Sequence, residues 1–195
     1  MAVAVGFAAQ AALSNIISGF FIVIFKHYRI NDRIVIKENL QGIVEDITLR
    51  HTIIRDFNNR RIVIPNSIIS NEIVTNADLQ DGRICRFVEL GISYDSDIQR
   101  AKQIIAEEAL KHPLQIDGRT EEARTNGEKE VPVRVLSFGE SSVNLQAWVW
   151  ANNQADGFQM YCDLLESIKE RFDAEGIEIP FPHRTLVMKN KISDS

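Results

Sequence analysis

The chain has 195 residues, of which 45% are hydrophobic and 25% are charged, and its formal net charge is −5. This length and composition are ordinary for one or two folded domains, and the negative charge provides no basic field for nucleic-acid binding. The two cysteines, Cys85 and Cys162, are too few for a disulfide scaffold, which favours a reducing compartment.

The first segment of the chain is apolar, because no charged residue occurs from residue 1 to residue 25. A helix of that length extends about 37 Å, which exceeds the roughly 30 Å hydrocarbon core of a bilayer. A cleavable signal peptide is disfavoured because the basic residues follow the segment instead of preceding it. We therefore predict a transmembrane helix, and a buried helix of a soluble core or a simple membrane anchor stay open as alternatives.

Small residues occur on several faces of this predicted helix, which favours close packing against other helices in lipid. They are Ala2, Ala4, Gly6, Ala8, Ala9, Ala11, Ala12, Ser14, Ser18 and Gly19. Since the chain contains one such segment, the expected neighbours are copies of itself or helices outside this chain.

One helical face changes from apolar to polar along its length. Val3 and Phe7 are four residues apart, and Gln10, Ser14 and Ser18 continue the face at spacings of four. In a ring of such helices this face would line a pore, with an apolar constriction at Val3 and Phe7 that closes by dewetting. The alternative is that the polar residues only hydrogen-bond neighbouring helices.

Basic residues follow the apolar segment directly, at Lys26, Arg29 and Arg33. An excess of Lys and Arg marks the cytoplasmic side of a membrane helix, so the rest of the chain is predicted to lie in the cytoplasm. The same three residues are candidates for contact with anionic lipid headgroups, or they form a solvated basic face.

Residues 29–80 are predicted to form a small all-β domain. Short β-branched runs at residues 34–36, 43–44, 52–54 and 62–64 predict strands, with turns at residues 39–42 and 56–59. The last run ends at Pro65, which cannot donate to a strand ladder.

Residues 81–180 are predicted to form an α+β domain of ferredoxin-like type, in the order strand, helix, strand, strand, helix. The predicted strands cover residues 87–92, 131–136 and 142–150, with a hairpin turn at Gly139 and an exposed loop from residue 117 to residue 130. The first helix is predicted to start at Ser96, as N-cap of a capping box with Gln99, and to end at Pro113. The second helix ends at Gly176. The predicted buried stripes are Ile98, Ala101, Ile105 and Ala109, and Phe158, Tyr161, Leu165, Ile168 and Phe172.

No motif in the sequence predicts catalysis or a cofactor. The four histidines are scattered without metal-ligand spacing, and no phosphate-binding glycine loop or nucleophile elbow occurs. We therefore expect a protein that is not an enzyme and that has no catalytic residue, metal or cofactor.

Several short motifs together resemble the small-conductance mechanosensitive channel (MscS) family, over nearly the whole chain. Residues 6–10, 13–15, 19 and 25–29 resemble the family's pore helix and its exit, and Pro65 and Asn66 lie in a stretch (residues 63–69) that resembles its most recognisable β-domain motif. Residues 91–97 and 172–177 resemble the start and the end of its α/β domain.

The resemblance implies a homoheptamer with a hollow cytoplasmic vestibule and a kinked pore helix closed by a ring of apolar side chains. Val3 and Phe7 match that ring, where the family usually has leucine, and Ala11 stands where the family usually has a glycine at the kink. The resemblance also implies that residues 185–188 form a strand of an intersubunit barrel, and that at least two membrane helices precede the pore helix. Helix packing and the kink are assigned to Gly6, Gln10, Ala11, Asn15 and Gly19.

These predictions combine into one scheme: a pore-lining transmembrane helix at residues 1–28, a β domain at 29–80, an α+β domain at 81–180, and a C-terminal strand and tail at 181–195. The expected function is a channel of the inner (plasma) membrane that membrane tension opens to release ions and small osmolytes during hypo-osmotic stress. Its expected partners are copies of itself, membrane lipids, ions and small solutes, with no nucleic acid. The alternative is a non-channel oligomeric scaffold anchored in the membrane.

Overall fold

The computed structural model describes residues 2–37, 39–184 and 186, and for residues 2–9 and 11 it describes the backbone only. The chain divides into two compact units, Met1–Gly82 and Arg83–Ser195, which are called the first and the second unit below. Each is described by itself.

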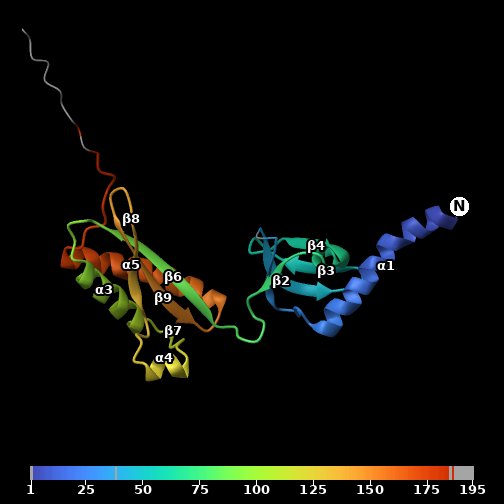
Figure 1. The fold of residues 1–195 in the computed structure, drawn as a ribbon, viewed down its shortest axis with the longest axis horizontal. Helices are drawn as coiled ribbons and strands as arrows, with labels where there is room; N and C mark the ends of the chain where they lie inside the picture. Colours follow the sequence, from blue (N-terminus) through green and yellow to red (C-terminus); the bar gives the residue numbers. More distant parts are fainter. Residues whose placement is uncertain (1, 38, 185, 187–195) are drawn as a thin grey trace, which may run out of the picture. The chain divides into compact units, whose positions relative to one another are not determined.

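The first unit joins one long helix to a five-stranded antiparallel sheet (Figure 1). Helix α1 (Ala2–Phe25) comes first, and the strands follow in the sheet order β4-β3-β2-β1-β5. Their bounds are β1 (Arg33–Ile36), β2 (Leu40–Ile47), β3 (His51–Arg55), β4 (Arg61–Pro65) and β5 (Val74–Asn76), and the short helix α2 (Asn66–Ile69) lies between β4 and β5.

The β-branched runs form β1 to β4 as predicted, because alternate side chains of each strand reach one buried face. The turn at residues 56–59 is confirmed: Asn59 has a φ of 63°, and the Asp56 carboxylate accepts hydrogen bonds from the amides of Asn58 and Arg60. The turn predicted at residues 39–42 is wrong. Leu40 already pairs with Ile36, so the turn lies between these two residues.

Gly42 lies inside β2 because the backbone of β3 passes close to it. A Cβ atom at this position would lie 2.6 Å from the carbonyl oxygen of Arg55. This glycine therefore serves a close approach between strands, and not the turn that the sequence suggested.

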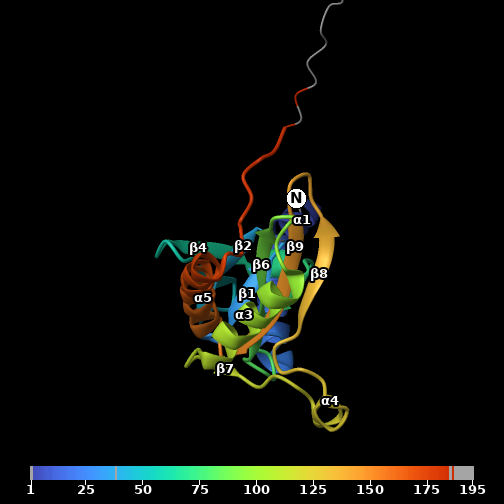
Figure 2. The same ribbon diagram turned by 90° about the vertical axis from the view of Figure 1, so that its left-hand side faces the viewer.

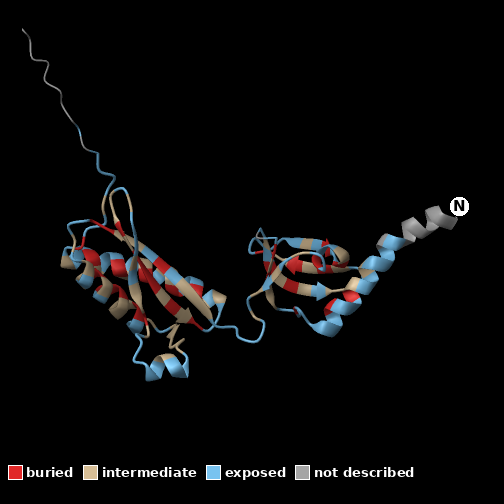
Figure 3. Ribbon diagram, in the orientation of Figure 1, coloured by how far each residue is buried: buried red, intermediate tan, exposed pale blue. Residues whose placement is uncertain are grey.

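The core of the first unit includes residues from α1 and from the chain that follows it. Ile22 and Tyr28 are buried together with side chains of the sheet and α2, namely Ile34, Ile36, Val44, Ile54, Ile64 and Ile69 (Figure 3). The C-terminal half of α1 is thus part of the same packed unit as the sheet. In the part of the chain that the structure describes, no helix combines the length and the apolar character needed to cross a membrane.

The second unit is an antiparallel sheet with two helices on one face (Figure 2). Its elements are β6 (Ile84–Ile92), α3 (Ile98–Lys111), β7 (Gln115–Ile116), α4 (Glu121–Thr125), β8 (Val133–Phe138), β9 (Val143–Ala151) and α5 (Gln154–Glu175). Both β6 and β8 pair antiparallel with β9 and are therefore parallel to each other, with α3 in the connection between them. This is the predicted split βαβ arrangement.

Successive side chains of β9 point to opposite faces of this sheet. Val143, Leu145, Ala147, Val149 and Ala151 are buried against α3 and α5. The residues between them, which include Trp148 and Trp150, face the side that these helices leave uncovered. The hairpin turn at Gly139 is confirmed by a hydrogen bond from its amide to the Ser142 carbonyl.

The helix ends and buried stripes of the second unit differ in part from the predictions. Asp97, and not Ser96, is the N-cap of α3, because its carboxylate accepts hydrogen bonds from the amides of Gln99 and Arg100. Gly176 ends α5 in the left-handed conformation, as predicted. The buried residues are Ala101, Ile104, Ile105 and Ala109 in α3, and Gly157, Met160, Leu164, Ile168 and Phe172 in α5.

The segment from residue 117 to residue 130 is not a plain loop. It contains α4, whose N-terminus is capped by the Thr120 hydroxyl. An ion cluster holds the segment: Asp117 accepts from Arg119 Nε and Nη2 at 2.9 Å each, and from Arg124 Nε at 3.1 Å. The predicted strand at residues 185–188 lies outside the described residues, except for an exposed Leu186.

Candidate functional site

The candidate site is the junction between α1 and α2, where the long helix meets the segment that resembles the β-domain motif. Asn15, Ser18, Gly19 and Ile22 follow the spacing of one helical face, and this face of α1 lies against the first unit's sheet and α2. The opposite side of α1 is apolar and exposed.

Asn15 caps α2 from another helix. The residue before α2, Pro65, makes no side-chain cap, so the first amides of α2 need an external acceptor. The side-chain oxygen of Asn15 accepts from the Ser67 amide at 3.0 Å and from the Ser67 hydroxyl at 2.9 Å. The position of α1 is thereby tied to the position of α2 across 52 residues of sequence.

Asn66 is fully buried beside this contact and connects three segments. Its side-chain nitrogen donates to the Thr48 carbonyl at 2.9 Å, and its side-chain oxygen accepts from the Thr52 hydroxyl at 3.0 Å. The Tyr28 hydroxyl lies 2.9 Å from the same Thr52 oxygen. Because Thr52 gives its proton to Asn66, Tyr28 is the donor in that pair.

Gly19 brings the backbone of α1 close to Asn66. A Cβ atom here would lie 2.6 Å from the Leu49 carbonyl oxygen and closer still to the side-chain nitrogen of Asn66. Such a contact would require the backbone of one segment to move. The close approach therefore needs glycine at this position.

The exit of α1 is held by hydrogen bonds to β5. Lys26 has a φ of 54° and its amide donates to the Ile22 carbonyl, which ends the helix in the left-handed conformation. Asn76 then donates its side-chain nitrogen to the His27 carbonyl at 3.1 Å and to the Asp32 carboxylate at 2.8 Å. The same Asp32 oxygen accepts from the Arg29 amide at 2.8 Å.

The three predicted headgroup residues have different environments. Lys26 and Arg29 are exposed. Arg33 is half-buried, with its guanidinium 5.7 Å from the centre of the Phe57 ring and its Nε buried without a hydrogen-bond partner among the described atoms. The structure thus separates Arg33 from the other two.

The predicted pore residues are described only in part. The side chains of Val3, Phe7 and Ala11 and the surroundings of Gly6 are outside what the structure describes. Gln10 and Ser14 are exposed, whereas Ser18 is half-buried and lines a groove with Tyr28 and Ile69. A series with a spacing of four residues turns by about 40° at each step, so Ser18 has turned from the exposed side to the edge of the docked face.

Sequence reasoning missed the partners of α1. It assigned Asn15 and Gly19 to packing or a kink within the helix, and it gave no role to Ser67, Thr52 or Tyr28. Small residues predict a close approach but do not say to what, because a neighbouring helix and a β domain both fit them. Among the described residues, no group of three His, Cys, Asp or Glu side chains could hold a metal ion.

Two family models cover most of the chain. Residues 11–79 match the model described as "Mechanosensitive ion channel, beta-domain", and residues 88–179 match "Mechanosensitive ion channel MscS, C-terminal". The first match includes the junction described above.

Curated relatives are similar along almost the whole chain. An uncharacterized MscS family protein of Archaeoglobus fulgidus is 31% identical over 97% of this chain and 62% of its own length. The large-conductance mechanosensitive channel MscMJLR of Methanocaldococcus jannaschii is 33% identical over 95% of this chain and 50% of its own length. The chain thus spans between half and two thirds of the length of these relatives.

A solved structure has the same fold. Helicobacter pylori MscS, in a crystal structure of the closed state, superposes with a TM-score of 0.80 at 30% sequence identity, over 97% of this chain and 70% of the solved chain. The family models, the relatives and this structure agree, and the chain belongs to the MscS family of mechanosensitive ion channels.

Proposed function

We propose that this chain is the pore helix and cytoplasmic body of a channel that membrane tension opens. The channel is a homoheptamer in the inner (plasma) membrane with its body in the cytoplasm, and it releases ions and small osmolytes during hypo-osmotic stress. The names of the relatives and the structural similarity to Helicobacter pylori MscS support this proposal.

The observation that carries the proposal is the junction of α1 with α2. A helix that opens and closes a pore must be positioned by the body below it. Here Asn15 positions the helix by two hydrogen bonds from Ser67, and Gly19 by its close approach to the Leu49 carbonyl and the Asn66 side chain. The contact is local and polar, so a second position of the helix would exchange these hydrogen bonds for others.

The remaining surface of α1 supports assembly with copies of itself. Its exposed apolar residues are Leu13, Ile16, Ile17, Phe20, Phe21, Val23, Ile24 and Phe25. An apolar surface of this extent on one helix marks a contact with protein or lipid. Neighbouring copies cover part of this surface, and lipid and further membrane helices cover the rest.

In the proposed mechanism, tension favours the state with the larger area in the membrane. The seal is formed by Val3 and Phe7, whose ring widens and fills with water on opening. Gly6, Gln10 and Ala11 pack the upper part of the helix against neighbouring copies, and the exposed Lys26 and Arg29 contact lipid headgroups. The C-terminal strands assemble into a barrel below the body.

The test is electrical recording from liposome patches that contain the protein. We expect currents that appear with suction, and Phe7→Ser should conduct without suction because it replaces an apolar seal with a polar group. Phe158→Ser, the same change at an exposed residue of the second unit, is the matched control. An unchanged resting conductance in Phe7→Ser would remove Phe7 from the seal.

The subunit number provides a separate test. The detergent-solubilised protein should have the mass of seven copies. A monomer or a dimer cannot enclose a vestibule, and either result, together with patches that show no current, would favour the anchored scaffold.

A further inference from the structure

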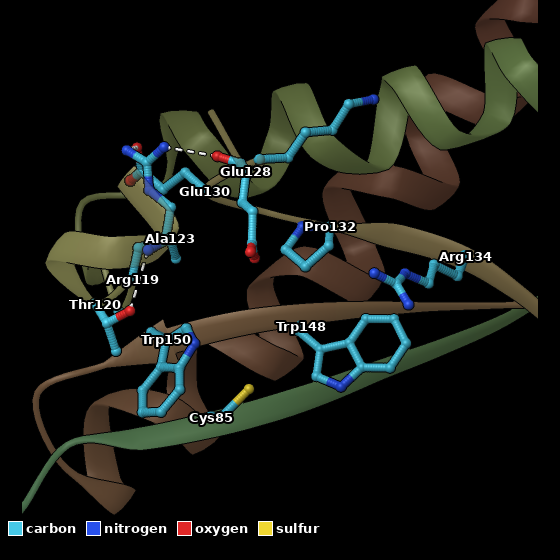
Figure 4. Close-up of a pocket in the computed structure, with 12 residues that line it drawn as sticks. Cys85, Arg119, Thr120, Ala123, Glu128, Glu130, Pro132, Arg134, Trp148 and Trp150 are labelled. Carbon is cyan, nitrogen blue, oxygen red and sulfur yellow. Dashed lines mark hydrogen bonds and ion pairs between the residues drawn. The ribbon is translucent and has the colours of Figure 1, made fainter. Parts of the chain in front are cut away.

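The open face of the sheet in the second unit carries a pocket to which the proposed function assigns no role (Figure 4). Its floor consists of Cys85 in β6 and of Trp148 and Trp150 in β9, and Cys85 pairs with Trp150 in the sheet. Pro132 lies above this floor. Burial raises the pKa of the Cys85 thiol, so the floor carries no negative charge at neutral pH.

One wall of the pocket is held rigidly by the ion cluster around Asp117. Arg119, bound by Asp117 through two hydrogen bonds, also donates to the Glu128 carbonyl at 2.8 Å. Gly118 lies flat against the Trp150 ring, where no Cβ atom would fit. The backbone that carries Glu128 is thus fixed relative to the tryptophans.

Two charged side chains of opposite sign line this pocket without an ion-pair or hydrogen-bond partner among the described residues. The Glu128 carboxylate and the Arg134 guanidinium form no ion pair or hydrogen bond in the described part of the chain, with each other or with other residues. Figure 4 shows them on either side of Pro132, with Arg134 above Trp148 and Glu128 on the side of Trp150. The Arg134 guanidinium lies 6.0 Å from the centre of the Trp148 ring, which restricts its position.

The other charged groups of the pocket either have partners within the chain or also line a neighbouring groove. Arg119 is neutralised by Asp117 and lies 3.7 Å from Glu130, which also accepts a hydrogen bond from Gln115. Lys129 lines this pocket and also the groove beside α3. Apart from Lys129, the pocket therefore presents one carboxylate and one guanidinium over an apolar floor.

From this arrangement we infer that the pocket binds a small zwitterion of the betaine or amino-acid class. The ligand's carboxylate pairs with Arg134, and its ammonium group lies by Glu128. The apolar body between them rests on Pro132 and the indole surface. A quaternary ammonium fits best because it is weakly hydrated and favours aromatic surroundings.

The chain offers a direct readout, because Trp148 and Trp150 are its two tryptophans and both line the pocket. The full chain is titrated with glycine betaine, and tryptophan fluorescence and heat of binding are recorded. Choline keeps the ammonium group but lacks the carboxylate. The anion 3,3-dimethylbutanoate keeps the carboxylate and replaces nitrogen with carbon.

We expect saturable binding of glycine betaine, with each analogue weaker by about tenfold or more, because each loses one charge-assisted contact. Glu128→Gln should abolish the preference over 3,3-dimethylbutanoate, and Arg134→Gln should abolish the preference over choline. Glu122→Gln, the same change at an exposed position of the same segment, should alter nothing.

The inference is overturned by any of four results: no saturable change with glycine betaine, equal binding of choline, equal binding of 3,3-dimethylbutanoate, or unchanged betaine binding in both variants. Calorimetry accompanies the fluorescence because Arg134→Gln alters the surroundings of Trp148 directly. None of these results bears on channel activity, so the two proposals fail independently.

Discussion

Asn15 in the first helix and Ser67 in the short helix α2 are joined by two hydrogen bonds to a single oxygen. A side chain of the long helix thus replaces the cap that Pro65 cannot provide. The contact makes the start of α2 sensitive to the position of α1.

Replacing Asn15 with Ala should expose the Ser67 amide. The change removes the acceptor of two hydrogen bonds, which should lower the free energy of unfolding by about 1–3 kcal/mol. A few tenths of a kcal/mol are regained because Ala is a better helix former than Asn. Hydrogen exchange at the Ser67 amide should accelerate by about tenfold or more. Ser14→Ala, at the exposed neighbouring position, is the control. Equal exchange in both variants would show that the contact does not hold α2.

Replacing Gly19 with Ala should destabilise the first unit although Ala favours helix by about 1 kcal/mol. The added Cβ would lie 2.6 Å from the Leu49 carbonyl, and a backbone atom cannot move aside alone. We expect a net loss of about 1–3 kcal/mol in denaturant unfolding. Ser18→Ala tests the neighbouring half-buried position. A Gly19→Ala variant as stable as the unmodified chain would contradict the close approach.

The hydrogen bonds from Tyr28 to Thr52 and from Thr52 to Asn66 predict which substitution lowers the stability of the first unit more. Tyr28→Phe removes one donor and should cost about 0.5–1.5 kcal/mol, whereas Thr52→Val also leaves the Asn66 oxygen without a donor and should cost more. In the double variant the loss of Tyr28 should cost less than it does alone, because its acceptor is already gone. Additive losses in chemical unfolding would argue against a connected network.

The second unit should lose stability in acid because of Arg171. This arginine on α5 donates to Glu107 and Glu108 of α3 and to Glu175, at 2.7 to 3.0 Å. Hydrogen bonds from Arg171 lower the pKa of Glu107, and those from Arg100 and then Arg171 lower the pKa of Glu175. The stabilisation is present above the unfolded value of about 4.3 and is lost as the pH falls through the lowered values.

Arg171→Gln should therefore lower the thermal midpoint at pH 7 and have a smaller effect at pH 3. Lys169→Gln, which removes the exposed pair with Asp173 on the same helix, should show no such pH dependence. A loss of the same size at both pH values would mean that Arg171 acts by packing alone.

Sequence patterns predicted the second unit well because its signals are local. Strands β8 and β9, the hairpin at Gly139 and the end of α5 at Gly176 each follow from a few neighbouring residues. The N-cap of α3 was placed one residue early because Ser96 and Asp97 are both good caps, and only the backbone decides between them. The predicted buried stripe of α5 is wrong at Phe158, which is exposed near the N-terminal end of the helix.

The junction could not be predicted in the same way because it depends on contacts between distant segments. Helix α2 has four residues, too few for a periodic signal. The role of Asn15 depends on a partner 52 positions away, and that of Gly19 on a carbonyl in the β2–β3 turn. The resemblance marked Asn15, Gly19 and Asn66 as notable positions, but only the folded chain brings them together.

The bonds of Asn76 have a consequence for how α1 can move. A single side-chain nitrogen donates to both ends of the short stretch between His27 and Asp32, so this stretch cannot lengthen without losing a bond. The freedom that remains lies one residue earlier, at Lys26, whose left-handed backbone relies on no hydrogen bond from β5 among those described. Reorienting the helix would therefore turn the chain at this residue, and it would also break the Asn15–Ser67 hydrogen bonds and withdraw Ile22 from the core.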